Sequence, residues 1–107
     1  MSYLVLRTDT ADEQIREIAF YLARVSGSPD VALRFVDKLE EAMDSLSEFP
    51  ERGAIPRWDT LARQGLRYVT VGEYIVLYAI DNQRKAVVVQ AVVHGRREYW
   101  KTIGDEL

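Results

Sequence analysis

The sequence predicts an α+β fold in which a helix hairpin covers one face of a mainly antiparallel sheet. Two amphipathic helical segments stand between a short first strand and three later strand candidates, which gives the order β-α-α-β-β-β. A chain of 107 residues with 48% hydrophobic and 29% charged side chains has the composition of a folded protein with one core. We therefore expect one two-layer domain over residues 1–107.

The first two elements are a strand over Tyr3–Arg7 and an amphipathic helix. The segment that follows the strand fits a capping box, in which Thr10 caps the helix and Glu13 reaches back to the Thr10 amide. Gly27 is expected to end the helix, because glycine readily adopts the left-handed conformation common at helix C-termini. The apolar stripe of this helix comprises Ile15, Ile18, Ala19, Leu22 and Val25.

A second amphipathic helix follows almost at once. We expect Ser28 to cap it and Pro29 to occupy its first helical position. Its apolar stripe comprises Val31, Ala32, Phe35, Val36, Leu39, Ala42, Met43, Leu46 and Phe49. Two such helices with a short connection form an antiparallel hairpin, and we interpret both stripes as core-packing surfaces rather than as a ligand groove.

Three strand candidates follow an irregular connection that runs from Pro50 to about Gln64. These candidates are Leu66–Val71, Glu73–Ile80 and Ala86–Val93. Gly72 predicts a tight hairpin between the first two. The last candidate is apolar on both faces, which is typical of a central strand. A short C-terminal helix is expected to pack on the sheet through Tyr99, Trp100, Ile103 and Leu107.

The composition argues against several kinds of site and location. The chain has no cysteine, which excludes disulfides and thiolate catalysis, and its single histidine argues against a zinc site. No signal-peptide pattern opens the sequence, and no apolar run approaches about 20 residues. We therefore expect a cytoplasmic protein with no cofactor, no metal and no membrane partner.

Charge is distributed unevenly along the chain. The formal net charge is −3, but residues 1–51 carry eleven acidic and five basic side chains, whereas residues 52–101 carry four acidic and nine basic ones. Eleven of the fourteen basic residues are arginine, which favours planar, bidentate contacts with anionic groups. The second half of the chain is therefore expected to present a basic face.

The most informative stretch is the end of the last strand, where the apolar run stops at His94, Gly95, Arg96 and Arg97. Positive side chains held at a rigid strand end can bind an anion or a carboxylate-rich partner. The alternative is a solvated strand end that binds nothing. Arg67 has a similar alternative, as a charge that protects an edge strand from aggregation. We expect a positioning role for His94 rather than that of a general base.

Three ordered motifs carry a resemblance to a known family. They are Leu46-x-x-x-Pro50-x-x-Gly53, then Arg67 with Gly72-x-Tyr74-x-x-x-Tyr78, then His94-Gly-Arg-Arg97. Together they resemble the ParE/RelE superfamily of toxins from bacterial type II toxin–antitoxin modules, over about Ala11 to Glu98. The resemblance implies a compact sheet with two helices on one face. It also implies a cognate antitoxin whose C-terminal segment folds onto the toxin in a hetero-oligomer.

The target divides this superfamily into two branches. RelE-like members are ribosome-dependent mRNA endonucleases that cut without a metal, using basic side chains. In that branch an arginine follows the tyrosine of the middle strand, whereas here Tyr74 is followed by Ile75. The late tyrosine or histidine of that branch also has no clear match, since Ile103 falls near its place, although Arg97 does match a RelE arginine.

ParE-like members inhibit DNA gyrase by binding, and the resemblance favours this branch. The matching positions are Pro50, Gly53, Arg67, Gly72, Tyr74, Tyr78 and Arg97. We expect no catalytic residues, and a gyrase-binding surface formed by Arg67, His94, Arg96, Arg97 and Trp100. Carboxylates of the antitoxin are expected to pair with Arg67, Arg96 and Arg97. The alternative is a RelE-like enzyme that acts on ribosome and mRNA.

Overall fold

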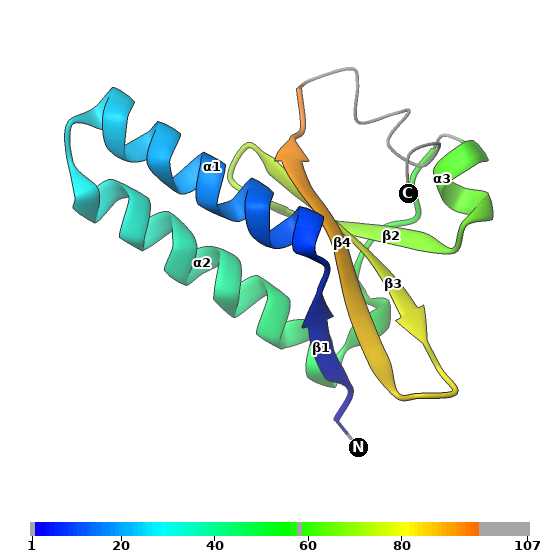
Figure 1. Cartoon of the computed structure of the whole chain (residues 1–107). Helices are drawn as coiled ribbons and strands as arrows, with labels where there is room; N and C mark the ends of the chain where they lie inside the picture. The colour runs from blue at the N-terminus through cyan, green and yellow to red at the C-terminus, as the bar shows by residue number, and fades with distance from the viewer. Residues whose placement is uncertain (1, 58, 97–107) are drawn as a thin grey trace.

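The computed structural model describes residues 2–57 and 59–96, and it shows two helices packed on one face of a four-stranded sheet (Figure 1). The elements in chain order are β1 (Leu4–Arg7), α1 (Asp9–Ser26), α2 (Pro29–Glu48), the 3-10 turn η1 (Pro50–Arg52), α3 (Asp59–Arg63), β2 (Leu66–Val71), β3 (Tyr74–Asp81) and β4 (Ala86–His94). The α+β fold and its mainly antiparallel sheet are confirmed. The predicted C-terminal helix lies outside the described residues.

The sheet has the order β1-β4-β3-β2. β2, β3 and β4 form the predicted antiparallel meander, and β1 pairs with β4 in the parallel direction. β4 is therefore a central strand, as its apolar sequence predicted. A parallel neighbour requires a crossover connection, and the helix hairpin supplies it between β1 and the meander.

Side chains are buried on both faces of the sheet. The larger core lies under the helix hairpin, and its fully buried members include Leu39 and Leu46 of α2 and Tyr78 of β3. The smaller core lies on the opposite face, where Leu61 of α3 covers side chains of β2, β3 and β4, Leu77 among them. α3 was not predicted, because its five residues fall inside a connection punctuated by proline and glycine.

The start of α1 differs from the prediction. The cap is Thr8, not Thr10, and the helix begins at Asp9. The Thr8 hydroxyl accepts a hydrogen bond from the Ala11 amide at 3.1 Å and donates one to the Gln90 carbonyl, also at 3.1 Å. Thr8 can therefore join the helix start to β4 as well as cap it, which no local pattern reveals. Gly27 ends the helix as predicted, with a φ of +67°.

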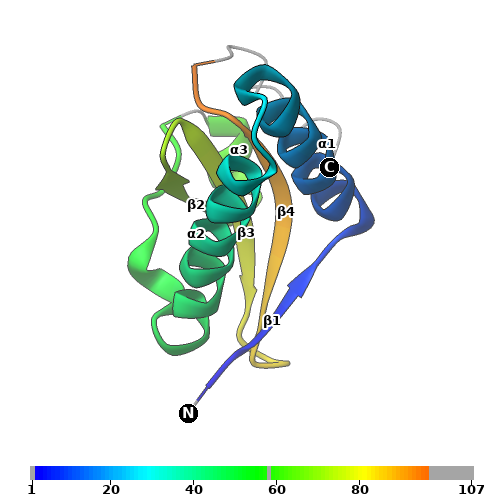
Figure 2. The same ribbon diagram turned by 90° about the vertical axis from the view of Figure 1, so that its left-hand side faces the viewer.

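The helix hairpin extends beyond the sheet in Figure 1, and its connected end faces the viewer in Figure 2, which is turned by 90°. Ser28 and Pro29 occupy the predicted cap and first helical position, although the Ser28 side chain makes no capping bond. Val25, which was predicted to be a core residue, is 59% exposed, and Phe49 is exposed as well. The helices of 18 and 20 residues lie across the strands at an angle, so the connected end of the hairpin passes the edge of the sheet (Figure 1). No helix in the described part of the chain is long and apolar enough to span a membrane.

Candidate functional site

A β-bulge at Gln90 decides which way the end of β4 faces. Tyr78 pairs with Val89 and Leu77 pairs with Ala91, so Gln90 has no partner of its own in β3. An extra residue shifts the alternation of side chains by one position. Val87 and Val89 face the helices before the bulge, and Val92 does so after it. The shift therefore also directs His94 to the helix side, beside Tyr74.

His94 is held by three neighbours. Its Nδ1 accepts a hydrogen bond from the Arg96 amide at 3.1 Å, and its Nε2 lies 3.5 Å from Oε2 of Glu73. The Tyr74 ring meets the imidazole edge-on, with 5.3 Å between the ring centres. An Nδ1 that accepts a hydrogen bond leaves the proton of a neutral imidazole on Nε2, which lies near the Glu73 carboxylate. Both ring nitrogens are thus engaged, which suits the predicted positioning role.

Glu73 also binds Arg96, whose Nη2 lies 3.4 Å from Oε1 of Glu73. Glu73 stands in the turn between β2 and β3, and the Gly95 amide donates to its carbonyl oxygen at 2.8 Å. The turn and the end of β4 are therefore joined by backbone and side-chain contacts. The Arg96 guanidinium is largely exposed and has further donors with which to bind a partner's anionic group.

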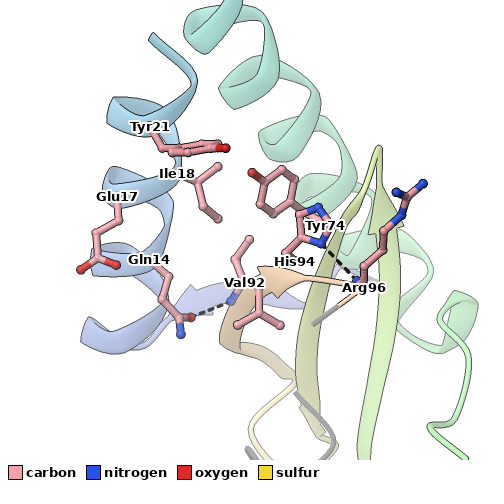
Figure 3. A pocket seen from close by; sticks show the side chains of 9 residues that line it. Gln14, Glu17, Ile18, Tyr21, Tyr74, Val92, His94 and Arg96 are labelled. Atoms are coloured by element: carbon pink, nitrogen blue, oxygen red, sulfur yellow. Dashed lines mark hydrogen bonds between the residues drawn. The ribbon is translucent and has the colours of Figure 1, made fainter. Parts of the chain in front are cut away.

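An open groove of about 470 Å³ lies beside this cluster, between α1 and the end of β4 (Figure 3). Its lining residues are Gln14, Glu17, Ile18, Tyr21, Tyr74, Val92, Val93, His94 and Arg96. The rings of Tyr21 and Tyr74 stand on opposite sides of the groove, with Ile18 between them. Gln14 closes the lower end, where its Oε1 accepts a hydrogen bond from the Val92 amide at 2.8 Å.

Arg67 lies elsewhere and binds backbone. Its Nη1 donates to the carbonyl oxygens of Gly53 at 3.0 Å and Glu51 at 3.3 Å. Arg67 is paired with Tyr78, whereas His94 is paired with Tyr74, four residues before Tyr78 in β3. At ordinary strand dimensions this separation is about 16 Å between the α-carbons of Arg67 and His94. The structure brings His94 and Arg96 together and does not bring Arg67 to them.

The Tyr78 hydroxyl and the Arg67 guanidinium both bind the backbone of the turn after α2. It donates to the Pro50 carbonyl at 2.7 Å and accepts from the Gly53 amide at 2.9 Å. Burial raises the pKa of Tyr78, because the charged form would lose its hydration, and the Gly53 amide and the Arg67 charge oppose this rise only in part. Pro50, Gly53, Arg67 and Tyr78, which the sequence motifs contain, thus form one structural unit.

Gly53 fits this unit because it has no side chain. A Cβ atom at this position would collide with the Tyr78 hydroxyl and lie 2.7 Å from the Tyr68 carbonyl oxygen. Its φ of −75° is open to any residue, so the requirement for glycine is steric and not conformational.

Two of the predicted site residues, Arg97 and Trp100, lie outside the described residues. Sequence reasoning missed Glu73 and the groove residues Gln14 and Tyr21. One sequence feature could have indicated Glu73. It directly precedes the strand that pairs with the last strand of the predicted meander, so it lies near the end of β4. Gln14 and Tyr21 had none, because they lie on an exposed side of α1 in the sequence pattern. Among residues 2–57 and 59–96, no three His, Asp or Glu side chains are grouped closely enough to hold a metal ion.

Solved structures with a similar fold come from toxin–antitoxin systems. A chain of the Mycobacterium tuberculosis RelBE2 toxin–antitoxin complex is 29% identical, with a TM-score of 0.62, and the match covers 88% of this chain and 99% of that one. A chain of the chromosomal ParDE system of Pseudomonas aeruginosa has a TM-score of 0.71 at 17% identity, over 87% of this chain and 96% of that one. A mutant of the Escherichia coli RelE toxin in the free state has a TM-score of 0.64 at 13% identity, with both chains fully covered.

No curated protein matches the sequence significantly. The family described as "ParE toxin of type II toxin-antitoxin system, parDE" matches residues 5–99. This match includes the strand and helix hairpin, the Pro50–Gly53 turn, the meander and the His94–Arg97 segment. The chain belongs to the ParE toxin family of type II toxin–antitoxin systems.

Proposed function

We propose that this toxin inhibits DNA gyrase by binding it, and that a cognate antitoxin neutralises the toxin. The match to the ParE toxin family over residues 5–99 carries the proposal. The binding surface is the end of β4 with the segment after it, which includes His94, Arg96, Arg97 and Trp100. Arg67 belongs to the predicted binding set as well, but its bonds to the Glu51 and Gly53 carbonyls favour a structural role.

The geometry around His94 supports binding rather than catalysis. A general base needs a ring nitrogen that is free to accept a proton from the substrate. Here Nδ1 accepts a hydrogen bond from the Arg96 amide, and Nε2 lies 3.5 Å from Oε2 of Glu73. At Ile75, where a RelE-like nuclease has arginine, the side chain is buried among apolar neighbours of β2 and β4. Position 75 therefore lacks the arginine of that branch, and the His94 nitrogen that could accept a proton already accepts a hydrogen bond.

The alternative is a ribosome-dependent mRNA endonuclease. The specific observation in its favour is the 29% identity to a chain of the RelBE2 complex, which exceeds the identity to the ParDE chain. Arg97, which matches an arginine of the RelE pattern, would then stabilise the charge that develops on the phosphate. Under this alternative, Arg97 would be a catalytic residue.

Two parallel assays distinguish the proposals. In the first, purified toxin is added to gyrase with relaxed plasmid DNA, and supercoiling is followed with and without antitoxin. In the second, toxin is added to translating ribosomes, and mRNA ends are mapped by primer extension. We expect loss of supercoiling that antitoxin restores, with intact mRNA. Site-specific mRNA cleavage without any effect on gyrase would overturn the proposal in favour of the nuclease.

A further inference from the structure

The sheet has one covered edge and one open edge. The edge strands are β1 and β2 (Figure 1). Beside β2, Ala54 forms an antiparallel bridge with Tyr68, in which each amide donates to the other carbonyl at 2.9 Å. Beside β1, the described part of the chain supplies a backbone partner only for Tyr3, whose amide donates to the Ser47 carbonyl at 2.8 Å. An edge strand with open backbone groups can pair with a strand of another chain.

The open backbone groups of β1 belong to two residues. The Thr8 amide donates to the Val89 carbonyl of β4 at 3.0 Å, so the backbone groups of Thr8 point into the sheet. Consecutive residues of a strand direct their N–H and C=O groups to opposite edges, so those of Val5 and Arg7 point outward. The groups of Tyr3 point outward as well, but Ser47 binds them. The open edge therefore consists of Val5 and Arg7.

One two-fold register lets two copies of β1 satisfy these groups. An axis at Val5 would place Arg7 opposite Tyr3, whose backbone groups are already bound. An axis at Arg7 would place two guanidinium groups side by side, and like charges in this position repel. An axis at Leu6 places Val5 of one copy opposite Arg7 of the other, and each such pair exchanges two hydrogen bonds. The Leu6 register thus pairs every open backbone group of the edge.

The side chains beside a Leu6 axis are complementary. On the helix side, Val5 lines a cavity of about 180 Å³ together with the carboxylates of Glu40 and Asp44. The Arg7 side chain of the second copy would stand opposite Val5, within reach of these carboxylates. Neither carboxylate forms an ion pair within the part of the chain that the structure describes. On the other face of the sheet, the 44% exposed Leu6 would meet its own copy.

Arg7 has donors available for this contact. Its Nε lies 3.0 Å from Oδ1 of Asp12 in the same chain, and both side chains are 39% exposed. A guanidinium has five N–H donors, which is more than one carboxylate accepts. Arg7 can therefore keep its bond to Asp12 and bind a carboxylate of a second copy as well.

We propose that the free toxin forms a two-fold dimer through β1, with its axis at Leu6, so that two four-stranded sheets join into one. The assembly closes at two copies, because Ala54 covers part of the other edge. β1 has only four residues, so the interface is small and we expect association at micromolar rather than nanomolar concentration. The proposal is independent of the proposed function, since it involves neither gyrase nor antitoxin.

The first test uses single cysteines, because the chain has none of its own. Leu6→Cys places two thiols opposite each other at the axis, where the α-carbons are about 4.5 Å apart and a disulfide can form. Leu4→Cys is the matched control, since Leu4 is the other exposed leucine of β1 and is 62% exposed. In the Leu6 register the two copies of position 4 are about 14 Å apart, too far for a disulfide.

Both cysteine variants are treated with copper–phenanthroline, and covalent dimer is followed on non-reducing gels. We expect Leu6→Cys to cross-link about tenfold faster than Leu4→Cys, or more. Equal rates, or faster cross-linking of the more exposed Leu4→Cys, would overturn the proposal.

The second test exchanges charges across the interface. In Arg7→Glu a carboxylate faces the acidic cavity, and in the double variant Glu40→Lys, Asp44→Lys two ammonium groups face Arg7. Each variant alone should be monomeric, whereas an equimolar mixture should form a heterodimer, because only the mixed pair joins opposite charges at both ends of β1. Arg16→Glu is the control: like Arg7→Glu it removes an ion pair of α1, with Glu13, but it lies away from the edge.

Sedimentation velocity from about 10 to about 500 µM measures association of the unchanged toxin, the variants and the mixture. Circular dichroism first confirms that each variant is folded. We expect the unchanged toxin and Arg16→Glu to show the same concentration-dependent dimer. If the unchanged toxin is monomeric at every concentration, or if mixing the charge variants restores no dimer, the edge of β1 does not bind a second copy and the proposal is wrong.

Discussion

Replacing Tyr78 by phenylalanine removes a single oxygen atom from the place where the hairpin-side core meets the Pro50–Gly53 turn. Tyr78 is fully buried, and its hydroxyl makes two hydrogen bonds, to the Pro50 carbonyl at 2.7 Å and from the Gly53 amide at 2.9 Å. Without the hydroxyl, a backbone donor and a backbone acceptor lose their partner beneath the turn. A hydrogen bond contributes about 0.5–1.5 kcal/mol net, and a buried group left unpaired costs about 1–3 kcal/mol.

We therefore expect Tyr78→Phe to lower the free energy of unfolding by about 2–4 kcal/mol. For a chain of this size the change corresponds to a fall in melting temperature of roughly 8–16 °C. Urea denaturation followed by circular dichroism measures it. The matched control is Tyr3→Phe, because the Tyr3 hydroxyl donates to Asn82 Oδ1 at 2.8 Å in an exposed position, where water can replace the lost bond. If both variants lose the same stability, the buried hydroxyl does not hold the turn as argued.

Three further outcomes are expected. Leu39→Ala removes a fully buried side chain of α2 and should cost about 2–5 kcal/mol in urea denaturation; a cost below about 1 kcal/mol would contradict the packing of this helix. Burial raises the pKa of Tyr78, so the unfolded chain releases this proton first, and stability should fall as the pH rises above about 10. The free energy of unfolding of Tyr78→Phe should fall less between pH 9 and pH 11 than that of the unchanged protein. Equal falls would show that the Tyr78 hydroxyl does not cause this pH dependence. Arg97→Lys should lower toxicity only moderately in a growth assay if the toxin acts by binding, whereas complete loss would favour catalysis.

Local sequence patterns were sufficient for the helix hairpin and the meander. The helical stripes, the proline at position 29 and the glycines at 27 and 72 are signals that act within a few residues, so they predict elements and turns directly. The apolar run of β4 also predicted its central place, because strands with both faces covered are typical of the interior of a sheet. How far along each helix the apolar stripe is buried was less predictable, since Val25 fits the stripe but lies beyond the strands and is exposed.

The position of each functional side chain depended on contacts between distant segments. Thr8 rather than Thr10 caps α1, and its hydroxyl also reaches the Gln90 carbonyl of β4. The single unpaired residue Gln90 directs His94 to the helix side, and no periodicity within Ala86–His94 marks where the register shifts.

The sequence by itself determined the helix hairpin, the strands of the sheet, the family resemblance and the basic end of β4. Only the tertiary structure decided which arginine is available to a partner: Arg67 binds backbone carbonyls, whereas Arg96 shares the exposed Glu73 carboxylate with His94. Side-chain type and spacing follow from the chain alone, but the partners of a guanidinium are set by strand register. Register is fixed by packing and by one bulge, which are properties of the whole fold.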